Sequence, residues 1–126
     1  MTNRIAVILL LASALMAADK DKECAAQAEK AVAKYGGELI LSHYSPKHGR
    51  CYVLEVDVDV HNKAVQLLLS DASVEEKNGS GLAIMRYAFP PNNPEFCSMG
   101  GPITDVPNVS RDCAAVRRYI HEHLTN

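Results

Sequence analysis

The chain has 126 residues, four cysteines and no tryptophan, and 13 Lys and Arg stand against 15 Asp and Glu, a formal net charge of −2 at pH 7. A chain of this length builds one domain with a modest hydrophobic core. The acidic balance argues against nucleic acid as a partner, because phosphate binding requires a basic patch.

The N-terminal residues have the order of a secretory signal. Arg4 precedes an uninterrupted run of small and apolar residues from Ile5 to Ala18, and the sequence then becomes charged at Asp19. The run is shorter than the roughly 20 residues of a membrane-spanning helix. A basic start, a short apolar middle and small residues at the end together predict export.

We expect cleavage after Ala17 or Ala18, which divides the chain into a signal peptide, residues 1–18, and one small domain, residues 19–126. No membrane span is expected once the signal is removed. Cleavage takes away Arg4 alone among the charged residues, so the net charge becomes about −3. The expected location is periplasmic or extracellular.

All four cysteines follow the signal, at Cys24, Cys51, Cys97 and Cys113. An even number of cysteines in an exported chain of this size indicates a disulfide framework. We favour the pairs Cys24–Cys51 and Cys97–Cys113, the second because it would tie down a long loop. The competing arrangement joins two predicted helices through Cys24 and Cys113.

The first predicted element after the signal is a helix in the segment ECAAQAEKAVAKYGG. Asp19 or Asp21 can cap its start and Gly36-Gly37 can end it. Its apolar stripe repeats at helical spacing, and consists of Ala25, Ala28, Val32 and Tyr35.

Strands are predicted next. Residues 38–44 are a short apolar run. In 51–62 one face of a strand would be apolar throughout and is expected inward; it consists of Tyr52, Leu54, Val56, Val58 and Val60. Residues 63–72 are ambiguous between helix and strand, and we assign a strand because clearer strands flank them. A further strand is expected at 82–89.

Prolines after residue 89 predict an irregular connection over 90–109. A second helix should follow, with Ser110 as a suitable cap and a buried stripe of Cys113, Val116, Ile120 and Leu124. The fold class is therefore α+β: a three- to four-stranded antiparallel sheet, with an N-terminal and a C-terminal helix packed on one face and stapled by disulfides.

The candidate binding surface is the outward face of 51–62, formed by Glu55, Asp57, Asp59 and His61. Carboxylates two residues apart on a strand are roughly 6.5–7 Å apart, too far to hold calcium without other ligands. Counted from Asp57, the calcium-loop pattern also fails, because Asn62 replaces its glycine and Leu68 its final acid. We therefore interpret the face as solvated and able to dock a cationic partner.

No catalytic residue, metal site or cofactor is predicted. His121 and His123 are two apart on a helix and should face different sides. His43 shares a strand face with apolar neighbours and should be partly buried, while His48 lies in a turn.

Two segments, ECAAQAEKAVAKYGGE and SHYSPKHGRCYVLEV, resemble a group of small, uncharacterised exported bacterial proteins. These share a Cys-Ala-x-Gln-Ala helix, a His-Tyr strand end, a basic turn and a cysteine that opens an aliphatic strand. The resemblance implies export and cysteine pairing, and it carries no activity.

The chain also resembles cystatin-type protease inhibitors in its export, its length, its four cysteines and its helix before antiparallel strands. The segment Gln66-Leu67-Leu68-Leu69-Ser70 is similar to their Gln-x-Val-x-Gly inhibitory hairpin, although serine replaces the closing glycine.

From these observations we expect an exported, non-enzymatic binding or accessory domain whose partner is an exported or envelope protein. The alternatives are a cystatin-like protease inhibitor and a metal-assisted hydrolase that uses the acids and His61. The sequence leaves open the ligand, the host and the oligomeric state.

Overall fold

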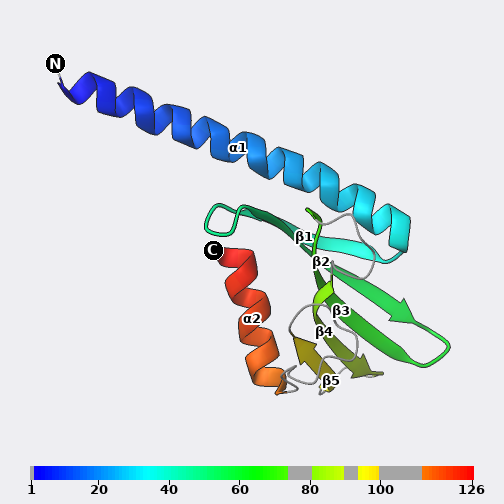
Figure 1. Ribbon diagram of the computed structural model, residues 1–126. Helices are drawn as coiled ribbons and strands as arrows, with labels where there is room; N and C mark the ends of the chain where they lie inside the picture. Colours follow the sequence, from blue (N-terminus) through cyan, green and yellow to red (C-terminus); the bar gives the residue numbers. More distant parts are fainter. Residues whose placement is uncertain (1, 74–80, 90–93, 100–111) are drawn as a thin grey trace.

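The computed structural model describes the backbone of residues 2–73, 81–89, 94–99 and 112–126, and the side chains of these ranges from Ala18 onward, except for Tyr35 and Glu95. A helix, five strands and a second helix follow one another along the chain (Figure 1). They are α1 (Thr2–Tyr35), β1 (Glu38–Ser45), β2 (Arg50–Asp59), β3 (Ala64–Asp71), β4 (Gly81–Ala88), β5 (Pro94–Met99) and α2 (Cys113–Thr125). The predicted α+β class is confirmed.

The five strands form one antiparallel sheet in the order β1-β2-β3-β4-β5, so each strand pairs with the next along the chain. The expected number of three or four strands is therefore wrong. The fifth strand lies in the connection 90–109 that was predicted to be irregular. Pro94 stands at the first position of β5, where a proline is tolerated, and the strand then pairs Phe96, Cys97 and Ser98 with β4.

The ambiguous segment 63–72 is a strand, as assigned. β3 pairs with β2 along one edge and with β4 along the other. Its alternating residues Val65, Leu67 and Leu69 share a face because side chains on a strand alternate between the two faces of the sheet. Leu69 at the centre is fully buried.

The two helices cover opposite faces of the sheet, and not one face as expected. Residues of α1 pack with Cys51 and Val53 in a cluster that we call the α1 cluster; it contains Cys24, Ala28, Val32, Cys51 and Val53. The α2 cluster contains Tyr52, Leu69, Ala83, Met85, Cys97, Val116 and Ile120. Neighbouring residues of β2 thus enter different clusters, because both faces of this strand are covered where it begins.

α1 is a single helix from Thr2 to Tyr35, so Asp19 and Asp21 lie inside it and do not cap its start. In Figure 1 its N-terminal part, drawn in blue, projects beyond the sheet, and its C-terminal part packs on β1 and β2. Within the part of the chain that the structure describes, no helix has both the length and the hydropathy that a membrane span requires.

α1 ends at the two predicted glycines. The Gly36 N–H donates to the Val32 carbonyl over 2.8 Å, and both Gly36 and Gly37 have positive φ, 84° and 92°. Only glycine adopts these angles readily. A Cβ at Gly37 would lie 3.1 Å from the Val56 carbonyl oxygen, so the glycine also lets the chain run close along β2.

α2 begins at Cys113 and its N-cap is Asp112, whose carboxylate accepts a hydrogen bond from the Ala114 N–H at 3.0 Å. Ser110, the predicted cap, lies outside the described residues. The predicted apolar stripe is confirmed: Val116 and Ile120 are buried, and Cys113 and Leu124 pack against the α2 cluster.

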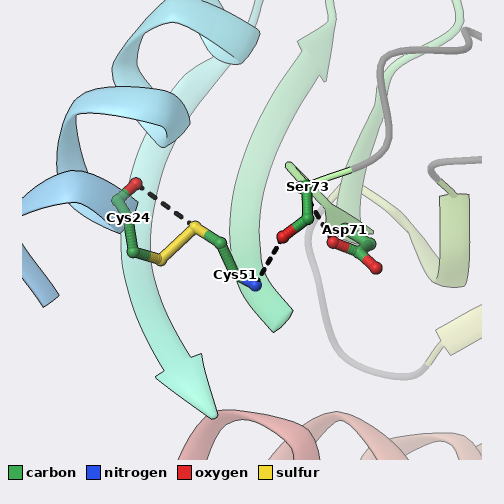
Figure 2. Close-up of a disulfide and its surroundings, with 4 residues drawn as sticks. All are labelled: Cys24, Cys51, Asp71 and Ser73. Atoms are coloured by element: carbon green, nitrogen blue, oxygen red, sulfur yellow. Dashed lines mark hydrogen bonds between the residues drawn. A yellow bond between two sulfur atoms is a disulfide. The ribbon is translucent and has the colours of Figure 1, made fainter. Parts of the chain in front are cut away.

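Both favoured disulfides are present, Cys24–Cys51 and Cys97–Cys113. The first joins α1 to the start of β2, and the second joins β5 to the first residue of α2. Figure 2 shows the surroundings of the first: the Cys51 N–H donates to Ser73 Oγ at 2.9 Å, and the Ser73 N–H donates to Asp71 Oδ1 at 2.8 Å. The backbone beside the disulfide is thereby fixed to the end of β3.

Candidate functional site

The second half of β2 differs from its first half in how much of it is covered. Val56 and Val58 share the face of Leu54, which lies in contact with the α2 cluster, so they were expected to be inward. Yet Val58 is 52% exposed, and Val60 in the following turn is 77% exposed. The expectation of inward valines is wrong beyond Val56. Alternation correctly separates the two faces of a strand, but it does not say how far each helix extends over them.

The predicted acidic face also splits. Glu55 is only 8% exposed, whereas Asp57 and His61 are exposed and Asp59 is half-buried. Glu55 lies opposite Leu39 of β1 and Leu68 of β3. The expectation of an outward Glu55 is therefore wrong, because apolar neighbours on both adjacent strands enclose it.

The Glu55 carboxylate packs against the chain reversal between α1 and β1. A Cβ on Gly37 would lie 3.1 Å from Glu55 Oε2, so the carboxylate occupies the space that any other residue at position 37 would need. Burial, and secondarily the charge of Asp57, raise the pKa of Glu55 above its ordinary value. Folding thus disfavours the ionised form of Glu55 relative to an exposed carboxylate, which argues for a structural role.

Asp59 belongs to the turn between β2 and β3. Its carboxylate accepts two hydrogen bonds from Asn62, one from the backbone N–H at 3.1 Å and one from Nδ2 at 2.7 Å. These bonds, followed by the charge of Arg86, lower the pKa of Asp59 below its ordinary value. Lys63 completes the turn with a φ of 51°. Asp59 is therefore ionised at neutral pH and held in place by the turn that it stabilises.

The four predicted site residues do not converge on one point. Glu55 is packed against Gly37, Asp59 bonds within the turn, and Asp57 and His61 face solvent. Among the residues that the structure describes, no group of three or more His, Cys, Asp or Glu side chains is arranged to hold a metal ion. Asp57, Asp59 and His61, but not the buried Glu55, share a place on one projecting segment.

We call residues 57–64, the end of β2 with its turn and the first residue of β3, the β2–β3 arm. In Figure 1 the hairpin formed by β2 and β3 extends away from α2, to the right of the view. The arm combines Asp57 and Asp59 on one face with Val58 on the other and Val60 at the turn. It was not predicted as apolar surface, because its valines look like core residues in the sequence.

A second polar cluster, also not predicted, lies where the end of α2 meets the sheet. The ring of His123 lies 4.9 Å from that of Tyr52, 4.0 Å from that of Tyr119 and 5.6 Å from that of His48, measured between centroids. His123 Nδ1 donates to the Tyr119 carbonyl at 2.8 Å, and Ser45 Oγ donates to the Asn126 carbonyl at 2.8 Å. These contacts fasten the last turn of α2 to β1 and β2.

His48 lies in the turn between β1 and β2, as expected. His121 is exposed and His123 is half-buried, so the two face different sides of α2. His43 is half-buried on the α2 side of β1, and its Nε2 is buried without a hydrogen-bond partner among the described residues. The residues that meet in this polar cluster come from two stretches far apart in the sequence, 45–52 and 119–126, which no local spacing could bring together.

A cavity of about 150 Å³ lies beside the Cys24–Cys51 disulfide. Its polar lining comes from α1, the end of β1 and the segment after β3, and includes Lys20, Glu23, Gln27, Tyr44 and Ser73. This volume is well below the roughly 300–1,000 Å³ of a typical small-molecule site. We therefore do not propose this cavity as a ligand-binding site.

The segment Gln66–Ser70, which resembles an inhibitory hairpin, lies inside β3 and is paired on both sides. The structure thus presents it as a central strand and not as a hairpin tip.

Comparison with known proteins gives no match: no protein-family model, curated protein or solved structure is similar to this chain.

Proposed function

We propose that the protein is an exported, non-enzymatic domain that binds a protein partner, from the exported fraction or the cell envelope, through the β2–β3 arm. The signal-like N-terminus and the two disulfides support export to an oxidising compartment. The net negative charge supports a protein partner rather than nucleic acid.

The observation that carries the proposal is the exposure of Val58 and Val60 on the arm. Leu41 of β1 is also 45% exposed, and it lies opposite Leu54 on the same face as Val58. Apolar side chains grouped on a projecting surface, bordered by charges, are typical of a protein interaction site. A partner that covers them removes apolar area from water, which favours binding.

The test is capture of partners from the exported fraction of the source, with the tagged chain that begins at residue 19 as bait. The double variant Val58→Ser/Val60→Ser should lose the partner that the unchanged chain retains. Phe96→Ser on β5 is a matched control, because Phe96 is also an exposed apolar residue but lies outside the arm. Melting temperatures of both variants should be measured beside the captures, since Val58 and Phe96 are about half in water and their replacement should cost little stability.

Recovery of no partner in repeated captures would defeat the proposal. A partner that binds the arm variant as well as the unchanged chain would show that binding takes place elsewhere. Export is tested separately by the intact mass of the secreted protein, which should correspond to a chain that begins at Ala18 or Asp19.

A further inference from the structure

β2 is longer than the strand that covers its outer edge. The pairing with β1 ends at Glu38 opposite Val56, whereas the pairing with β3 continues to Asp59 opposite Ala64. The segment Asp57–Asp59 is thus held on one edge only. No described residue pairs with its other edge, so its outward backbone N–H and C=O groups are open to another strand.

The chain itself keeps this edge open. β1 cannot extend further along β2, because α1 ends at Tyr35 and the glycines 36 and 37 turn the chain away from the sheet. Gly37 also lies against the Val56 carbonyl, the last position that β1 covers. An incoming strand would therefore lie in line with β1, beyond Glu38, where this sheet has no strand of its own.

The side chains of the open edge alternate in chemistry. Asp57 and Asp59 point to one face and Val58 to the other, with Val60 following in the turn. Asp57 is exposed and forms no ion pair within the part of the chain that the structure describes. A complementary strand would carry basic residues on the Asp57 face and apolar residues on the Val58 face, because directly opposite pairs of this kind stabilise a sheet.

A second copy of the chain is a poor occupant of the same edge. Two copies related by a two-fold axis would pair the edges antiparallel, which sets Asp57 and Asp59 against the same acids of the other copy. Parallel pairing also brings like charges together. Like charges opposite one another destabilise a sheet, so the acids that would attract a basic strand oppose self-association through this edge.

We propose that the open edge of Asp57–Asp59 binds an extended segment of a partner protein, which adds to the sheet as a further strand and alternates basic with apolar residues. This inference rests on the proposed function and specifies how the arm recognises its partner. Backbone hydrogen bonds supply attachment and the alternate side chains supply selectivity, as in other cases of strand addition.

The first test uses two synthetic peptides, one alternating lysine with valine and one alternating glutamate with valine, and measures binding by calorimetry at low and moderate salt. The lysine peptide should bind and the glutamate peptide should not. Asp57→Lys should weaken binding of the lysine peptide, because it replaces one of the two acids of this face by a cation. Glu122→Lys makes the same change of net charge on the exposed face of α2, and it should leave the preference unchanged. Equal binding of the lysine peptide to both variants would overturn the proposal.

The second test separates strand addition from attraction between charges. In two further lysine peptides, the amides along one edge or along the other edge are N-methylated, which removes their hydrogen-bond donors. Methylation of the edge that faces β2 should weaken binding about fivefold or more, and methylation of the opposite edge should leave it unchanged. Equal effects of the two patterns would contradict strand addition even if the charge reversal succeeds.

These results are distinguishable from failure of the proposed function. If the peptides do not bind, yet a captured partner is lost in Val58→Ser/Val60→Ser and retained in Asp57→Lys, the arm is a docking surface and strand addition is wrong. If no partner is captured and the peptides do not bind, both proposals fail.

Discussion

Cys51 and Tyr52 are consecutive in β2, and their side chains enter hydrophobic clusters on opposite faces of the sheet. Cys51 is bonded to Cys24 of α1, while the ring of Tyr52 packs edge-on against His123 of α2. Both residues are almost fully buried. The start of β2 therefore joins the α1 cluster to the α2 cluster. Substitution of either residue should lower the free energy of unfolding.

The disulfides should contribute much of the stability of so small a domain. Replacing Cys24 and Cys51 together by alanine removes a cross-link between residues 27 apart and should lower the free energy of unfolding by about 3–4 kcal/mol. The corresponding change at Cys97 and Cys113, which are 16 apart, should cost about 3 kcal/mol. Urea unfolding measures both losses.

Intact mass provides the control for this prediction. Reduction of the unchanged protein should add the mass of about four hydrogens, one for each thiol of two bridges. Variants that unfold at the same urea concentration as the unchanged protein would contradict the predicted contribution of the bonds.

Burial distinguishes two residues that look alike in the sequence. Leu69→Ala should lower the free energy of unfolding by about 2–5 kcal/mol, because Leu69 is completely buried in the α2 cluster. Val58→Ala should change it by less than about 0.5 kcal/mol, since Val58 is half in water. Thermal unfolding of both variants measures the difference, and a large loss for Val58→Ala would mean that this face is covered.

Glu55 should make stability depend on pH. Its pKa is raised mainly by burial, so ionised Glu55 opposes folding increasingly as pH rises from the ordinary carboxyl range through the raised value. Glu55→Gln should thus be more stable than the unchanged protein at neutral pH, and the advantage should disappear in acid below the ordinary pKa. Chemical unfolding at a series of pH values tests this, with the exposed Glu29→Gln as a control that should show no advantage at any pH.

The glycines after α1 should differ in their tolerance of a side chain. Gly36→Ala and Gly37→Ala both force alanine into a positive φ, which costs about 1–2 kcal/mol. A Cβ at Gly36 meets no atom within 4 Å, whereas one at Gly37 meets Glu55 Oε2 and the Val56 carbonyl at 3.1 Å. Gly37→Ala should therefore be the more destabilised variant in a thermal melt. Equal losses would mean that the contact with β2 relaxes without cost.

Much of this architecture could be predicted from local patterns. Alternation located β2, the need to tie down a long loop favoured Cys97–Cys113, and the glycines at 36 and 37 marked the end of the first helix correctly. β5 was missed because it has only six residues, begins at a proline, and lies between Pro90-Pro91 and Gly100-Gly101 in the sequence. The placement of helices on opposite faces also escaped prediction, since it depends on which residues of β2 each helix covers and not on the periodicity of either element.

The candidate site was harder to predict than the fold. The sequence correctly separates the faces of Asp57 and Val58, but it cannot show that β1 stops at Glu38 while β2 continues. Exposure of Val58 and burial of Glu55 both follow from this difference in length and from the limited extent of the helices. Both are properties of the assembled sheet.

The strand order has a consequence for how the chain acquires its structure. Each strand pairs with the one made just before it, so the sheet can grow hairpin by hairpin in the order of synthesis, and every step closes only a short loop. Cys51 can meet Cys24 as soon as β2 exists, before the rest of the sheet has formed. The contact between Ser45 and Asn126 joins residues 81 apart. We therefore expect α2 to dock last, and a chain that ends before α2 to carry the Cys24–Cys51 disulfide with the α2 cluster uncovered.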